Sequence, residues 1–140
     1  MTATLYVTER DTQNERSVIE RLTTRLQCQF AHFAYEASIC DYIAIREGTA
    51  IALVEIKTRT TPHNNYPTYI IDQSKLDRLA DTAQRLGLKP ILVIWFTDDI
   101  YWINATKRPW PVKPGGRNDR NDSNDIDQVY HIPVAELKRL

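Results

Sequence analysis

The chain has 140 residues, and its 18 Lys and Arg side chains equal its 18 Asp and Glu side chains, so the formal net charge is zero. This length is sufficient for a hydrophobic core of ordinary size, and we expect one domain over residues 1–140. The zero net charge removes the simplest argument for nucleic-acid binding, a strongly basic chain, but not a local basic surface.

The remaining composition predicts an intracellular protein. Cys28 and Cys40 fit no metal or redox spacing, and we interpret them as buried residues in a reducing compartment. We find no apolar run long enough to cross a bilayer and no basic-then-apolar leader. We therefore expect a soluble, cytoplasmic protein with no membrane partner and no small-molecule cofactor.

The first elements are a short segment, a helix and a strand. Residues 5–8 predict an edge strand or an arm. Thr12 and Glu15 have the spacing of a capping box, and a helix over about 13–28 is predicted by the apolar residues that follow at helical intervals, namely Val18, Ile19, Leu22 and Leu26. Residues 30–38 are rich in aromatic and small side chains and predict a strand.

A hairpin follows. Two strand-like runs, residues 40–46 and 50–58, flank the turn Glu47-Gly48-Thr49, in which Gly48 can supply a positive φ. The second run has apolar residues on both faces, which is typical of a central strand covered on both sides.

The second half begins with a polar segment, residues 59–69, which we interpret as a loop. A helix over about 73–87 is predicted next, with Gly87 as its C-terminal stop. Residues 91–96 predict a buried strand, and residues 100–104 predict its partner.

The composition changes over about residues 106–127, where Pro, Gly, Arg, Asn and Asp predominate, and we predict a mobile loop there. Trp110 in this segment is a candidate for stacking on unpaired bases. A strand and a short terminal helix near Pro133 complete the chain. The order α-β-β-β-α-β, with the extra C-terminal strand and helix, predicts an α/β fold with a mixed central sheet flanked by helices.

Glu55 and Lys57 are the first candidate functional residues. Alternate residues of a strand point the same way, so both side chains lie on one face of the sheet. A carboxylate can bind Mg²⁺, the Ile56 carbonyl between them is a further oxygen ligand, and the ammonium can orient water or offset phosphate charge. Taken alone, such a pair is more often a solvated salt bridge.

Asp41 on the preceding strand favours the catalytic interpretation. A two-residue turn would place it opposite Val54, with the wrong orientation, whereas a three-residue turn or an equivalent bulge places it opposite Glu55. We predict the second register, in which a divalent ion would relieve the repulsion between the two acids. The alternative is that Asp41 merely ends its strand at the solvent edge.

Asp41 and Glu55-Ile56-Lys57, in this order of elements, resemble the PD-(D/E)XK nuclease superfamily. The segments ERSVIERL, VEIKTRT and KLDRLADTAQRLGLKP are most similar to its archaeal Holliday-junction-resolvase and Mrr-like branches. The likeness covers roughly residues 12–96. One departure is Cys40, which stands where many members have Pro.

The resemblance implies a restriction-endonuclease-like core. It implies Asp41, Glu55 and the Ile56 carbonyl as ligands of Mg²⁺, for which Mn²⁺ can substitute, and Lys57 as the catalytic lysine. It also implies a polar residue in the first turn of the second helix, where Lys75 matches and Gln73 is the reserve.

The same family often carries a catalytic acid on its first helix, for which Glu15 and Glu20 are candidates. Glu15 lies within the apolar stripe of that helix, while Glu20 points away and is the reserve. Capping alone could also explain Glu15. Arg59 and His63, in the loop after the motif, are candidate contacts to the DNA backbone.

We therefore expect a Mg²⁺-dependent endodeoxyribonuclease, and the resolvase likeness suggests branched DNA as its substrate and a homodimer as its assembly. The alternatives are a non-cleaving nucleic-acid-binding or assembly module that keeps the fold, and a nuclease that acts on RNA or within a larger complex.

Overall fold

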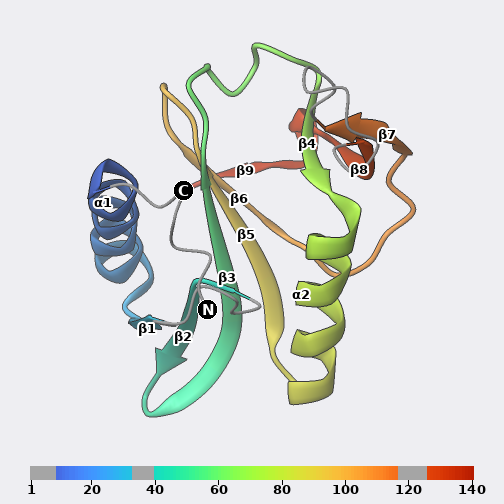
Figure 1. Ribbon diagram of the computed structural model, residues 1–140. Helices are drawn as coiled ribbons and strands as arrows, with labels where there is room; N and C mark the ends of the chain where they lie inside the picture. Colours follow the sequence, from blue (N-terminus) through green and yellow to red (C-terminus); the bar gives the residue numbers. More distant parts are fainter. Residues whose placement is uncertain (1–8, 33–39, 117–125) are drawn as a thin grey trace.

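The computed structural model describes residues 9–32, 40–116 and 126–140, which form two helices and two sheets (Figure 1). None of the helices in these ranges is long and apolar enough to span a membrane. The elements are α1 (Glu9–Leu26), β1 (Gln29–His32), β2 (Tyr42–Arg46), β3 (Thr49–Thr58), β4 (Thr68–Asp72), α2 (Gln73–Leu86), β5 (Lys89–Trp95), β6 (Ile100–Asn104), β7 (Val112–Gly116), β8 (Ile126–Pro133), a 3-10 turn (Val134–Glu136) and β9 (Lys138–Arg139).

The predicted α/β architecture with a mixed central sheet is confirmed. The large sheet has the order β1-β2-β3-β5-β6-β9, with β3 and β5 parallel and the other pairs antiparallel. Helix α1 lies on one face of this sheet, and α2 lies on the other with the small sheet β4-β8-β7 (Figure 1).

Strand β3 is central, as predicted, because its side chains enter both layers of the core. Val54 and Ile56 pack with Val18 and Leu22 of α1. Leu53 belongs to the opposite cluster, which includes α2 and the small sheet. Since side chains alternate along a strand, Glu55 and Lys57 share the face of Leu53 and point towards the layer of α2 and β4.

Several predicted boundaries need correction. Helix α1 begins at Glu9, so the Thr12–Glu15 spacing falls inside the helix and is not a capping box at its start. It ends at Leu26, before Gln27, whose φ of 53° is left-handed. Helix α2 ends as predicted at Gly87, with a φ of 70°. The predicted segment 5–8 and most of the predicted strand 30–38 lie outside the described residues.

The small sheet was not predicted. Residues Thr68–Asp72 form β4 at the end of the supposed polar loop, and Val112–Gly116 form β7 within the supposed mobile loop. Trp110 is only 7 % exposed and packs edge-on against Tyr130, so its predicted role in base stacking is wrong. The predicted terminal helix is a single 3-10 turn that leads into β9.

The predicted register of the β2–β3 hairpin is confirmed, but a bulge produces it and not a three-residue turn. Arg46 pairs with Thr49, so Glu47-Gly48 is a two-residue turn, and both residues have the positive φ that the primed hairpin turns require. Ala44 pairs with Ala52 while Ile45 pairs with Ala50, which leaves Ile51 as an extra residue. This bulge restores the register in which Asp41 approaches Glu55.

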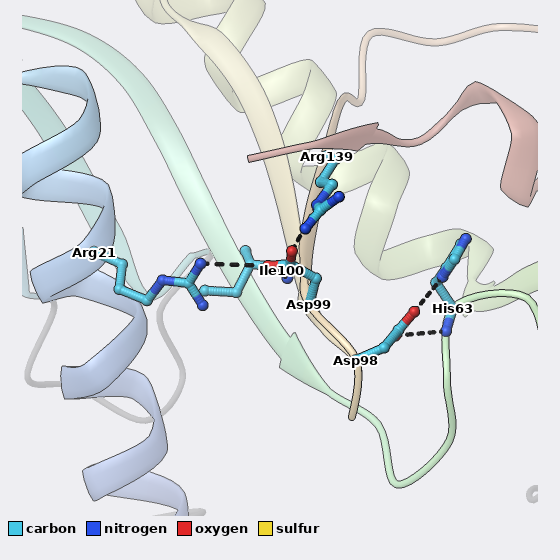
Figure 2. Close-up of polar contacts among 6 residues, drawn as sticks. All are labelled: Arg21, His63, Asp98, Asp99, Ile100 and Arg139. Carbon is cyan, nitrogen blue, oxygen red and sulfur yellow. Dashed lines mark hydrogen bonds and ion pairs between the residues drawn. The ribbon is translucent and has the colours of Figure 1, made fainter.

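The turn between β5 and β6 is linked to three other parts of the chain (Figure 2). Asp99 binds Arg21 of α1 at 3.3 Å and Arg139 of β9 at 2.6 Å, and it accepts the Ile100 backbone N–H at 2.7 Å. Asp98 accepts the backbone N–H of His63 and also contacts its imidazole. These contacts fix α1, β9 and the loop after β3 against one end of the sheet.

We predict that Asp99→Asn lowers the free energy of unfolding at neutral pH by about 1 kcal/mol, because it removes two ion pairs and keeps an acceptor for Ile100. The Ile100 hydrogen bond and then Arg139 lower the pKa of Asp99 below its ordinary 3.8. The folded state therefore gains stability above pH 3.8 and loses it as pH falls through the lowered pKa.

Urea unfolding of both proteins at pH 7 and near pH 2 measures this effect, and the difference should disappear at the lower pH. Asp81→Asn is the matched control, since Asp81 forms a single pair with Lys107 in which both side chains are about half exposed. Equal losses in the two variants would contradict a special role of Asp99.

Candidate active site

The candidate site lies where β2 and β3 stop pairing through their backbones. At this end of the hairpin, the last backbone hydrogen bond runs from the Asp41 N–H to the Val54 carbonyl at 3.1 Å. The next backbone donor of β3, the Ile56 N–H, donates instead to Oδ2 of the Asp41 side chain at 2.8 Å. The carboxylate thus takes the place of a backbone acceptor and is fixed beside β3.

Glu55 and Lys57 complete the centre of the site. Lys57 Nζ lies 3.3 Å from Glu55 Oε2, and the two side chains are 29 % and 21 % exposed. This pair is therefore not a solvated surface salt bridge, because both groups are largely removed from water. The pair lies on the face of β3 that points towards α2. Asp41 directly precedes β2, and the register of the two strands places it opposite Glu55.

The electrostatics of the two acids suit a bound cation. Burial, and then the neighbouring Asp41, raise the pKa of Glu55 to about 7, although Lys57 opposes this shift. Burial likewise raises the pKa of Asp41, against the Ile56 hydrogen bond and Lys57. Burial and mutual repulsion make the doubly ionised state unfavourable, and a cation between the groups would reverse this.

The donor set fits a hard divalent ion that also takes backbone and water oxygens. In the described part of the chain, no group of three or more His, Cys, Asp or Glu side chains is placed to bind a metal. Two carboxylates with one carbonyl and waters are nevertheless a common arrangement for Mg²⁺, which keeps several waters. A carboxylate has about four acceptor sites, so the Ile56 hydrogen bond leaves Asp41 able to bind an ion.

Two further basic side chains act on these acids. Lys75, in the first turn of α2, lowers the pKa of both Asp41 and Glu55, after larger effects of burial and nearer groups. Its charge therefore acts on the site from the layer of α2, and the role that the resemblance implied for it stays a prediction. His32 of β1 acts similarly on Asp41, and its ring lies 4.8 Å from that of Tyr42.

The two candidate acids of α1 differ as predicted in orientation. Glu15 is half-buried and Glu20 is exposed. The partner of Glu15 is the Tyr42 hydroxyl, which donates to its carboxylate. Tyr42 packs on the α1 side of the sheet, whereas Asp41 and Glu55 point to the other side. A catalytic role for either glutamate stays a prediction.

The remaining candidates lie near the site but have structural partners. Gln73 forms a hydrogen bond with Tyr130. Arg59 stacks over Tyr69 with 4.6 Å to the ring centroid and donates to the Ile70 carbonyl at 3.4 Å. His63 contacts Asp98 and stacks on Tyr101 at 4.4 Å, so it anchors its loop (Figure 2).

A cavity of about 480 Å³ opens between this loop and β4. It has a cationic rim and aromatic walls, and its lining includes Arg59, His63, Tyr66, Tyr69, Phe96 and His131. Arg59 connects it to the site, because this residue follows Lys57 by two positions at the end of β3.

Comparison with known proteins agrees with this geometry. A family model described as "Phage putative PDDEXK endonuclease" matches residues 1–140. The chain belongs to this family. It is accordingly an endonuclease of the PD-(D/E)XK superfamily, whose members generally use divalent metal ions. No curated protein matches the chain.

Two solved structures share the fold of this PD-(D/E)XK endonuclease. One is Hjc, a Holliday junction resolvase from Archaeoglobus fulgidus, with a TM-score of 0.55 and 12 % identity over 89 % of this chain and 97 % of that one. The other is a nuclease from a fusselovirus, with a TM-score of 0.50 and 14 % identity over 100 % of this chain and 89 % of that one. The predicted restriction-endonuclease-like fold is confirmed.

Two residues that act on the acids, His32 and Tyr69, were not among the predicted site residues. His32 pairs with Tyr42 across β1 and β2, but the end of β1 was not predicted to lie there. Tyr69 was assigned to a polar loop, although the run Tyr69-Ile70-Ile71 at the start of β4 is typical of a strand. If the pairing of β1 and β4 with their neighbouring strands had been known, it would have placed both residues near Asp41 and Glu55.

We predict that the metal-free protein loses stability as pH rises from 4.5, the ordinary pKa of Glu55, to about 7, its raised value. The folded state binds this proton more tightly than the unfolded state, so its advantage is complete below pH 4.5 and is lost through pH 7. Glu55→Gln should flatten this part of the profile, as measured by urea unfolding in EDTA. A decline in Glu55→Gln as steep as in the wild type would contradict the assignment to Glu55.

Proposed function

We propose that the protein is a Mg²⁺-dependent endodeoxyribonuclease that hydrolyses DNA phosphodiester bonds at Asp41, Glu55 and Lys57. The observation that carries this proposal is the pair of half-buried acids, Asp41 just before β2 and Glu55 on β3, with the Lys57 ammonium 3.3 Å from Glu55. Membership in an endonuclease family supports the reaction class.

Asp41, Glu55 and the Ile56 carbonyl would hold the ion. When bound, Mg²⁺ supplies Lewis-acid chemistry that offsets the charge developing on the phosphate. The Lys57 side chain, beside Glu55, would donate hydrogen bonds to the attacking water or to a phosphate oxygen. Lys75 approaches the same acids from α2 and adds positive charge on the side where substrate would enter.

The DNA would contact the loop after β3. Arg59 lies at the rim of the aromatic cavity and can bind the phosphate next to the scissile one. Branched DNA is the substrate that we favour, since a structure with this fold is described as a Holliday junction resolvase. Cutting two strands of a junction requires two sites, so we also propose a homodimer.

We predict that Lys57→Ala and Asp41→Asn each reduce cleavage by at least about 100-fold, because each removes a charged group that stabilises the transition state. Asn keeps an acceptor for the Ile56 N–H, so the fold is preserved. The assay uses supercoiled, linear, single-stranded and four-way-junction DNA with Mg²⁺, Mn²⁺ or EDTA.

Lys89→Ala is the matched control, since Lys89 is exposed at the start of β5, at the other end of the β3–β5 ladder from Lys57. It should cleave like the wild type. Full activity in both site variants would refute the mechanism. Wild-type protein that binds these DNAs without cutting them would favour the alternative, a non-cleaving module with the nuclease fold.

A further inference from the structure

Tyr69 of β4 has a buried hydroxyl that the proposed mechanism does not use. The residue is 4 % exposed and belongs to the core cluster beneath α2. Among the buried side-chain polar atoms of the described residues, the Tyr69 hydroxyl stands out because it has no hydrogen-bond partner of ordinary geometry. Buried polar groups are nearly always paired in native proteins, so this group requires an explanation.

The fold alone does not require a hydroxyl at this position. A phenylalanine would fill the same space and make the same edge-on contact with Phe96, whose ring lies 6.2 Å away. It would also avoid the cost of removing an unpaired hydroxyl from water. The packing of Tyr69 therefore gives no reason of its own for the hydroxyl, which is typical of a group placed for function.

The surroundings of the hydroxyl identify its acceptor. Tyr69 and Leu53 lie in one cluster, and Glu55 follows Leu53 on the same face of β3. Burial raises the pKa of Tyr69 to about 12, and the Glu55 charge adds to this rise. Arg59 opposes it through its charge and through a weak side-chain hydrogen bond that falls short of ordinary geometry. Glu55 is thus the neighbouring anion and Arg59 the neighbouring cation. The Arg59 guanidinium lies over the ring and holds its plane.

We propose that Tyr69 is a positioning residue whose hydroxyl donates a hydrogen bond to the ionised Glu55 carboxylate when the site is loaded. One Glu55 oxygen, Oε2, already contacts Lys57, and a carboxylate can accept several hydrogen bonds. Tyr69 from β4 and Lys57 from β3 would then fix the Glu55 carboxylate from two sides. Such second contacts to ligating carboxylates commonly set metal affinity. This inference rests on the proposed function.

The test compares Tyr69→Phe with Tyr130→Phe. Tyr130 lies in the same cluster, but its hydroxyl has a partner, the Asp77 carboxylate. At pH 8, calorimetric titration with Mn²⁺ should show affinity about 10- to 100-fold weaker in Tyr69→Phe and unchanged in Tyr130→Phe. In EDTA, the melting temperature should stay equal or rise in Tyr69→Phe and fall in Tyr130→Phe.

The outcomes separate this inference from the proposed function. Equal Mn²⁺ affinity in wild type and Tyr69→Phe would overturn the role of Tyr69 and leave the metal site standing. A fall in melting temperature of Tyr69→Phe in EDTA would also overturn it, because the hydroxyl would then have a partner in the fold. A wild-type protein that binds no Mn²⁺ would refute the proposed site and with it the role of Tyr69.

Discussion

The hydrogen bond from the Ile56 N–H to the Asp41 carboxylate determines where the site forms and which residues enter it. Backbone pairing between β2 and β3 ends at Val54, and an unpaired N–H on a buried central strand would cost about 1–3 kcal/mol. The Asp41 side chain supplies the missing acceptor. This single contact therefore separates the two strands, fixes the carboxylate beside Glu55 and satisfies the backbone of the central strand.

This arrangement also explains why two half-buried acids lie side by side. Asp41 cannot leave without exposing the Ile56 N–H, and Glu55 cannot turn outwards because β3 is covered on both faces. The fold holds the two carboxylates together despite their repulsion. Lys57 relieves this repulsion only in part, since the pKa values of both Asp41 and Glu55 stay raised. The fold thus sacrifices some stability to hold the two carboxylates together.

The core of the site was predictable from the sequence because it depends on local rules. Alternation along a strand places Glu55 and Lys57 on one face, and the hydrophobic pattern identifies β3 as central. The position of Asp41 depended on register, and the sequence does not distinguish a three-residue turn from a two-residue turn with a bulge at Ile51. Both give the same alignment, which is why Asp41 was placed opposite Glu55 correctly from the wrong turn.

The small sheet could not be predicted in the same way. Strand β4 pairs with β8, about 60 residues later, and β8 pairs with β7, so its order comes from contacts distant in sequence. The polar and proline-rich composition of the two segments suggested loops, yet Tyr69, Trp110 and Tyr130 anchor them in the core. Local composition therefore missed the layer that contributes Tyr69.

The loop between β3 and β4 connects these two parts of the site. It begins at Arg59, just after β3, and it returns at Tyr69, where Arg59 stacks on the ring. Its middle is anchored by His63, which binds Asp98 at the β5–β6 turn (Figure 2). Since the adjacent Asp99 also binds α1 and β9, one turn fixes both the outer layers and the loop. The position of Tyr69 beneath Arg59 therefore depends on contacts at the end of the sheet, remote from the acids themselves.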